Sequence, residues 1–398
     1  MLSRALALTV FSIAFVGCDS ADVTEPPPDA APTVRVEGRV GLSPRIVNAY
    51  LSRTGLVGDW QTLSDSSALS GLRAGALWMA GQQGGTLRAT GGTAVSAAPC
   101  DDVADGVYIV DADTAYAAEG WPATAGAPAT VDGAPRAYGD EMAWASVCSQ
   151  ATRRIDQTFD GLRVNAALFG YDALPHVVFV RYEVRNESAL AISDAYAGFW
   201  ADVDLTPYGY NLAGLDRDDR LGYTYLSPLG PTGEPFPDRA RGYVGGVQIL
   251  ETPGGAPFAA ARITDKNGGP FGEDELYGAA AFSNALRGLS NDGAPMVDPT
   301  TGAPSAFAYT GDPVGRTGWL DGFDSCGSAC RDDVQTGEDV RQLLSAGPFS
   351  LAPGEATTLT VAFLAHDVNG LRTGLDRLRQ DAARLRADAS LWRFPIAD

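Results

Sequence analysis

Two neighbouring segments near the middle of the chain constrain its fold most strongly, because both have the pattern of a half-buried β-strand. Residues 176–185 are rich in β-branched and aromatic side chains, and charges enter at every second position. The turn-forming residues Asn186, Glu187 and Ser188 follow, and residues 195–202 resume an apolar pattern. We therefore predict that these segments form an antiparallel pair of strands in a mainly β protein.

Other parts of the chain fit the same fold class. Residues 74–90 predict a hairpin whose apolar arms flank a glycine-rich turn at 81–85. Short strands are expected from residue 34 onward, over 138–147 and over 357–365. Residues 226–345 are rich in Gly and Pro, which favours long loops over short strands rather than helices.

The pattern changes near the C-terminus. Apolar residues recur there every three or four positions, at Leu371, Leu375, Leu378, Ala382 and Leu385. This spacing predicts an amphipathic helix whose apolar stripe covers the sheet. The expected fold is therefore a β-sandwich-like arrangement of antiparallel sheets with long loops and a C-terminal amphipathic helix.

The first 17 residues have the organisation of a bacterial export signal. Arg4 supplies one positive charge, and residues 5–17 form an uncharged apolar stretch too short to span a bilayer as a helix. Cys18 follows a small residue, as in the lipobox of bacterial lipoproteins, although Phe15 stands where Leu is usual. We predict cleavage before Cys18 and a lipid on its thiol; an ordinary secretory signal with a chance cysteine is the alternative.

The remaining chain divides into a tether and a body. Residues 18–33 are acidic and proline-rich, which favours an extended tether. Residues 34–398 are expected to form a β-rich globular region, either as one unit or as subdomains 34–150 and 151–398. The net charge is −20, which argues against nucleic acid or an anionic membrane face as a partner because both would repel the chain. Solvation of the surface is an alternative explanation of this acidity.

Four cysteines remain after Cys18 is set aside. An even number in an exported chain predicts two disulfides. Cys326 and Cys330 are close enough in sequence to close a small loop, which leaves Cys100 and Cys148 as the second pair. A zinc site is the alternative, although the two pairs differ in spacing and the chain has only two histidines.

An acidic stretch provides the main candidate for a binding site. Asp202 and Asp204 are two residues apart at the end of a predicted strand, so their carboxylates point to one face. Clustered carboxylates suit Ca²⁺, which takes six to eight oxygen ligands. We predict a structural calcium site with further ligands from the following loop, namely Asn211, Asp216, Asp218 and Asp219. A solvated loop partly paired with Arg217 and Arg220 is the alternative.

No sequence motif indicates a catalytic reaction. Paired carboxylates can hydrolyse glycosides, but a chain with 49 acidic residues satisfies that pattern easily. His176 begins one predicted strand and His366 ends another, so both are expected at the rim. Trp78, Trp144 and Trp200 lie on predicted strands and are expected in the core rather than on a sugar-binding surface.

Several segments resemble a family of large, secreted, uncharacterised β-rich proteins of Bacteroidota and related marine bacteria. The matching segments are residues 76–81, 139–144, 178–186 with 194–204, and 347–354. Members of that family often carry a C-terminal type IX secretion sorting domain; this sequence shows a lipobox instead. The resemblance implies a β-sandwich-like body with an acidic run after Trp200, and it implies no activity.

These features together predict a lipid-anchored protein of the cell envelope. We expect an outer-membrane lipoprotein that faces the periplasm or the cell surface. Its body would serve binding, adhesion or envelope structure without catalysis. The alternative is an envelope hydrolase that acts on glycans, which would need a cleft with carboxylates of perturbed pKa.

Overall fold

The computed structural model describes most of the chain beyond Arg35. The described residues are 35–37, 39–41, 50–52, 57–58, 72–91, 97–103, 106–111, 120–152, 154–205, 208–227, 243–265, 271–272, 276–322, 337–366 and 370–393. The predicted leader, the tether and Cys18 lie outside them, as do Cys326 and Cys330. No helix in the described ranges is both long and apolar enough to cross a bilayer.

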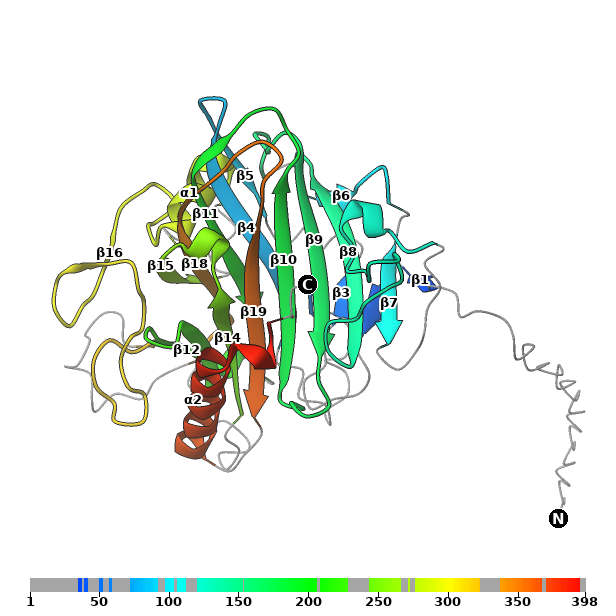
Figure 1. Cartoon of the computed structure of the whole chain (residues 1–398). Helices are drawn as coiled ribbons and strands as arrows, with labels where there is room; N and C mark the ends of the chain where they lie inside the picture. Colours follow the sequence, from blue (N-terminus) through cyan, green and yellow to red (C-terminus); the bar gives the residue numbers. More distant parts are fainter. Residues whose placement is uncertain are drawn as a thin grey trace, which may run out of the picture.

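Two antiparallel sheets form a sandwich (Figure 1). The larger sheet has ten strands, with β6 (Ala97–Pro99) paired to β8 beside the main path. The order along that path is β1 (Arg35–Glu37), β7 (Val107–Asp111), β8 (Glu141–Ser149), β9 (Leu162–Gly170), β10 (Val177–Asn186), β19 (Ala356–His366), β14 (Val244–Glu251), β13 (Leu221–Leu226) and β12 (Asn211–Asp216).

The smaller sheet has five strands and lies against the first. Its order is β15 (Phe258–Asp265), β18 (Val340–Leu351), β11 (Ile192–Asp202), β4 (Ala74–Gln83) and β5 (Thr86–Thr90). Two short pairs, two α-helices and four 3₁₀ turns complete the described elements. They are β2 (Arg39–Gly41) with β3 (Tyr50–Ser52), β16 (Met296–Val297) with β17 (Pro304–Ser305), α1 (Gly278–Leu286), α2 (Leu371–Ala387), η2 (Ala123–Ala125), η3 (Tyr208–Tyr210), η4 (Pro253–Gly255) and η6 (Ala389–Leu391).

The central strands do not pair with each other, so the predicted hairpin was wrong. β10 lies between β9 and β19 in the larger sheet, whereas β11 lies between β18 and β4 in the smaller one. Asn186 stabilises the connection in which the chain passes from the larger sheet to the smaller one. Its buried amide donates to the carbonyls of Leu190 and Leu351, and its oxygen accepts from Ser188. The alternation of apolar and polar residues identifies a strand but does not show which strands pair with it. Turn-forming residues are also compatible both with a hairpin and with a connection between two sheets.

The first hairpin is confirmed. β4 and β5 pair in register from Met79 with Thr90 to Gln83 with Thr86. Gly84 and Gly85 form the two-residue turn with φ values of 60° and 78°. The two-residue turn whose twist matches that of the flanking strands requires positive φ at both central positions. Glycine adopts positive φ without steric cost.

The core between the sheets comes from the inward-facing side chains of both. Val180 and Tyr182 of β10 lie in one cluster with Met79 of β4 and Phe199 of β11. The rings of Tyr182 and Phe199 are 6.2 Å apart. Burial of these side chains from water, at about 1.5–3 kcal/mol each, joins the two sheets.

Each sheet also has a covered outer face. Leu375 and Leu378 of α2 pack on the larger sheet, where α2 contacts β14 and β19. Phe282 of α1 packs on the smaller sheet, where its ring is 4.8 Å from that of Trp78. α1 thus contributes to the burial of β11, whereas on the outer side of β10 the ring of Tyr171 lies 6.0 Å from that of Phe179.

The expected β-sandwich and C-terminal helix are therefore present, and Trp78, Trp144 and Trp200 are buried as predicted. α1 lies within the segment predicted to contain loops and short strands, so the prediction was wrong there. Described strands from residues 34–150 and 151–398 share both sheets, since β4 pairs with β11 and β8 pairs with β9.

Candidate functional site

Three aspartates meet where the smaller sheet ends. Asp202 is the last residue of β11, Asp204 follows two positions later, and Asp339 immediately precedes β18. β11 and β18 are paired neighbours, so the end of one strand lies beside the start of the other. Each aspartate offers a carboxylate oxygen within 4.8 Å of the other two, a spacing that can hold a metal ion.

Two arginines partly neutralise this three-aspartate cluster. Arg73 donates from Nη1 to Asp204 Oδ2 at 3.1 Å. Arg341 lies 3.5 Å from Asp202 and 3.2 Å from Asp339. Among the described residues, three carboxylates therefore face two guanidinium groups, an excess of one negative charge, and Asp202 and Asp204 are only 4% and 0% exposed.

The acidity of the cluster is strongly perturbed. Burial, and then the charge of Asp204, raise the pKa of Asp202 to about 7. Burial, and then the charge of Asp339, raise the pKa of Asp204 as well. Both shifts have one physical cause: ionised carboxylates are poorly stabilised when they lose water and face each other. The raised pKa values favour protonation of the cluster, and its oxygen spacing is also suited to a cation.

Two oxygens in this cluster have no hydrogen-bond partner among the described residues. They are Oδ1 of Asp202 and Oδ1 of Asp204, and both are buried. Buried polar atoms are nearly always paired, so two buried carboxylate oxygens without a partner are unusual. A cation coordinated by these oxygens would satisfy both.

Asn211 is the predicted loop residue that lies beside the cluster. It begins β12, and its carbonyl accepts from the backbone N–H of Glu338 at 2.9 Å, next to Asp339 in sequence. Its side chain is fully buried, and neither amide atom has a hydrogen-bond partner in the described ranges.

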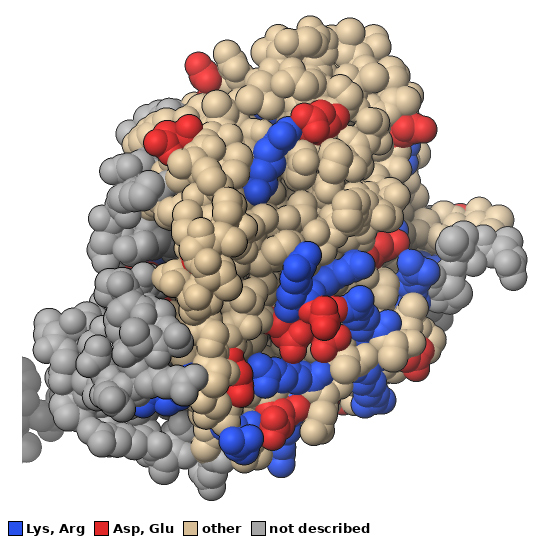
Figure 2. All heavy atoms as spheres, turned by 90° about the vertical axis from the view of Figure 1, so that its left-hand side faces the viewer, with Lys and Arg blue, Asp and Glu red and all other residues tan. Residues whose placement is uncertain are grey.

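Asp216, Asp218 and Asp219 lie at the opposite end of β12, about 17 Å or more along the chain from Asn211 at 3.3 Å per residue. Asp216 is 3.5 Å from Arg379, and Asp219 is 3.7 Å from Arg386. Their arginine partners come from α2, rather than from Arg217 and Arg220. Basic and acidic side chains are interleaved on this side of the molecule (Figure 2).

The structure thus divides the predicted ligand set. Asp202 and Asp204 come together, and Asn211 begins the strand that pairs next to Asp339. Asp216 and Asp219 form ion pairs elsewhere, and Asp218 is exposed. The sequence analysis missed Asp339, which is 135 positions beyond Asp204 in the sequence. The only local feature that could have indicated Asp339 as a site residue is its place at the start of a strand, two residues before Arg341.

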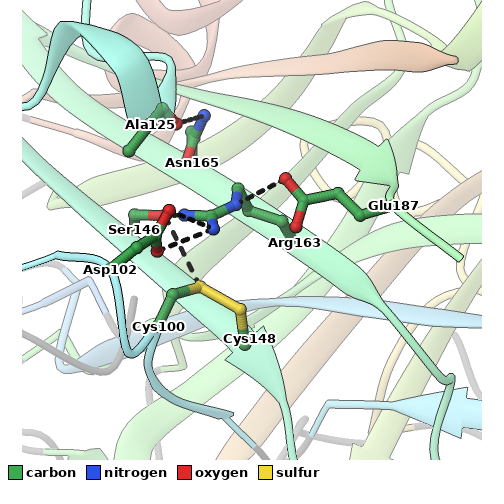
Figure 3. The surroundings of a disulfide bond; sticks show 8 residues. All are labelled: Cys100, Asp102, Ala125, Ser146, Cys148, Arg163, Asn165 and Glu187. Atoms are coloured by element: carbon green, nitrogen blue, oxygen red, sulfur yellow. Dashed lines mark hydrogen bonds and ion pairs between the residues drawn. A yellow bond between two sulfur atoms is a disulfide. The ribbon is translucent and has the colours of Figure 1, made fainter. Parts of the chain in front are cut away.

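The disulfide predicted between Cys100 and Cys148 is present, with a sulfur–sulfur distance of 2.06 Å. It joins β8 to the residue that follows β6 (Figure 3). Arg163 of β9 lies beside it and donates to Asp102 at 2.7 Å, to Glu187 at 2.7 Å and to the Ser146 hydroxyl at 3.0 Å. The disulfide therefore lies beside the buried guanidinium of Arg163, which donates hydrogen bonds to three acceptors.

Comparison with known proteins identifies no family for the chain. No protein family matches, and no curated protein matches. A solved polysaccharide lyase is similar with a TM-score of 0.31 and 9% identity, covering 89% of this chain and 35% of that chain. The chain thus spans about a third of the lyase. A TM-score of this size does not establish a common fold.

Proposed function

We propose that this chain is an exported cell-envelope protein, held at a membrane by lipid on Cys18, with a β-sandwich that serves binding, adhesion or envelope structure without catalysis. We place it in the outer membrane, facing the periplasm or the cell surface. The observation that carries export is the disulfide between Cys100 and Cys148, because such bonds persist in oxidising compartments. The apolar leader before Cys18 is the second support.

The anchor is tested by mass and by fractionation. The mature protein from membranes should begin at Cys18 and carry the added mass of acyl chains. Cys18→Ser should move the protein from the membrane fraction to the soluble envelope fraction, because a single thiol holds the lipid. Ser20→Ala is the matched control and should stay with the membrane. A mature chain that starts elsewhere, or one without acyl mass, would refute the proposal.

We further propose that the three-aspartate cluster binds a structural Ca²⁺. Asp202, Asp204 and Asp339 supply hard oxygen ligands, which calcium prefers. The cluster retains one negative charge after its two arginines are counted, and two of its buried oxygens have no partner among the described residues. A bound dication would keep all three carboxylates ionised and would satisfy those oxygens.

Burial also explains why a structural role is favoured over acid–base catalysis. A catalytic carboxylate has to reach a substrate, but Asp202 and Asp204 are 4% and 0% exposed and face Arg73 and Arg341. Their raised pKa values have a sufficient cause in burial and mutual repulsion. A cation that links β11 to β18 would instead stabilise the sandwich.

Thermal unfolding with and without chelator tests the calcium proposal. Calcium should raise the midpoint of the wild-type protein, and by mass action an excess of 100 times Kd adds about 2.7 kcal/mol. Asp204→Asn should abolish the response. Asp218→Asn also removes one acidic charge, but at an exposed position, and should respond like wild type. Indifference of the wild-type protein to both calcium and chelator would exclude the site.

A further inference from the structure

The chain has two histidines in all, and the fold places them side by side. His176 immediately precedes β10, and His366 ends β19, its neighbour in the larger sheet. The backbone N–H of Ala365 donates to the carbonyl of His176 at 3.1 Å. The two imidazole rings lie 4.6 Å apart between centroids, tilted by 30°. Residues 190 positions apart in sequence thus form one imidazole pair.

A carboxylate from α2 orients one of these rings. Asp381 Oδ2 lies 2.8 Å from Nε2 of His366. A carboxylate at this distance favours the tautomer in which Nε2 carries the proton and donates it. The lone pair of neutral His366 is then on Nδ1. Carboxylates often orient metal-binding histidines in this way, because they fix the tautomer and increase the basicity of the ligand nitrogen.

The Nδ1 atoms of His176 and His366 are both buried, and neither has a hydrogen-bond partner among the described residues. A buried acceptor without a partner is unfavourable, because it has lost its hydrogen bonds to water. Two such nitrogens on adjacent rings offer two lone pairs to one acceptor.

The pair also has a route to solvent. His176, Asp381 and Arg384 line a surface recess between the start of β10 and α2, together with Leu174 and Leu385. An ion of small radius can therefore approach His176 from this recess, and the ring of His366 lies 4.6 Å from that of His176. The recess lies on the larger sheet, whereas the three-aspartate cluster joins two strands of the smaller one.

We propose that His176 and His366 bind a transition-metal dication of the Zn²⁺, Cu²⁺ or Ni²⁺ class through their Nδ1 atoms, with Asp381 as the positioning residue for His366. Imidazole nitrogen suits these metals, whereas calcium prefers oxygen. Water or a ligand in the recess would complete the coordination. With two protein ligands, the site would be weaker than a closed structural zinc site.

Two positive charges oppose this cation and make the proposal sharply testable. Arg384 lines the recess, and the charge of Arg377 lowers the pKa of His176. Arg377, Asp381 and Arg384 are spaced by four and three residues, so they share one face of α2. Removing Arg384 should therefore tighten a cation and loosen an anion, which distinguishes a metal site from a site for carboxylate or phosphate.

The first experiment uses the full-length wild-type chain without a histidine tag. One equivalent of Cu²⁺ is added in excess calcium, which occupies the carboxylates, and electron spin-echo modulation is recorded. The remote nitrogen of imidazole should modulate the echo with the pattern of two rings. Because the chain has two imidazoles in all, this pattern from the wild-type protein identifies His176 and His366 as the ligands without any variant. Bound Cu²⁺ without that modulation would overturn the proposal, as would the absence of binding.

The second experiment measures Zn²⁺ affinity by calorimetry on variants whose circular dichroism matches wild type. His176→Gln and His366→Gln should each weaken binding at least tenfold, and Asp381→Asn should weaken it about tenfold or more. Arg384→Gln should tighten binding about two- to fivefold. Asp376→Asn, at an exposed position of α2, should leave the affinity unchanged. Weaker binding in Arg384→Gln, or equal affinity in the His176→Gln variant, would overturn the proposal.

Discussion

Replacing Asp202 with asparagine should stabilise the metal-free protein, although the substitution removes a charged partner of Arg341. Burial and Asp204 raise the pKa of Asp202 from 3.8 to about 7. Each pKa unit corresponds to about 1.36 kcal/mol, so ionising Asp202 in the folded protein costs on the order of 4 kcal/mol. Asparagine has the shape of the neutral acid and avoids that cost.

The sign of the effect depends on pH. The folded protein holds the Asp202 proton more tightly than the unfolded chain does. The stability that this proton contributes is therefore complete below about pH 4 and is lost as the pH rises to about 7. In chelator, the difference in unfolding free energy between Asp202→Asn and wild type should grow from near zero at pH 4 to about 4 kcal/mol at pH 8. Calcium should remove most of this difference by stabilising the ionised wild type.

Urea unfolding of both proteins across this pH range, with the disulfide intact, measures the difference directly. Asp218→Asn is the control for a lost negative charge, since that residue is exposed. It should follow the wild-type curve. If Asp202→Asn is instead less stable than wild type at pH 8 by several kcal/mol, then Arg341 and Arg73 already stabilise the ionised carboxylate and the argument from burial fails.

Three further predictions concern stability, and urea unfolding checks each. Replacing Cys100 and Cys148 together with serine should lower the unfolding free energy by about 4 kcal/mol, the chain-entropy value for a separation of 48 residues. Leu378→Ala should cost about 2–5 kcal/mol because the side chain is fully buried beneath α2, whereas Leu371→Ala should cost less. Asn186→Ala should cost about 2–4 kcal/mol through lost buried hydrogen bonds, and Asn284→Ala, with one such bond, should cost less.

The sequence predicts the strands well because their pattern is local. Each residue of β10 reports its own face through alternation, and the spacing of apolar residues in α2 reports a helix in the same way. Strand neighbours are different, because they depend on surfaces far away in sequence. β11 pairs with β18 about 150 positions later, and Asn186 gives no local sign that the chain changes sheets.

The same distinction applies to the candidate site. Asp202 and Asp204 were predicted to converge because residues two apart in a strand share a face. Asp339 joins them through the pairing of β11 with β18, which no local pattern encodes. His176 and His366 were both assigned to strand ends, which is correct for position, but the burial of His366 and the contact of the two rings arise from strand order.

Strand order also predicts how calcium should act on the rates of folding. The cluster forms only when Arg73, Asp204 and Asp339 meet, and the ion pair of Arg73 with Asp204 spans 131 residues. Contacts that close such long loops form late, when most of the sheet is already paired. We expect a cation bound there to stabilise the native state and not the transition state for folding.

Calcium should then slow unfolding and leave the refolding rate unchanged. At 100 times Kd, the stabilisation of about 2.7 kcal/mol corresponds to roughly a hundredfold slower unfolding. Stopped-flow refolding and unfolding in calcium and in chelator measure both rates, with Asp204→Asn as the control that should respond in neither. Faster refolding with an unchanged unfolding rate would mean that Asp202, Asp204 and Asp339 assemble early. The cluster would then organise the sandwich during folding rather than secure it afterwards.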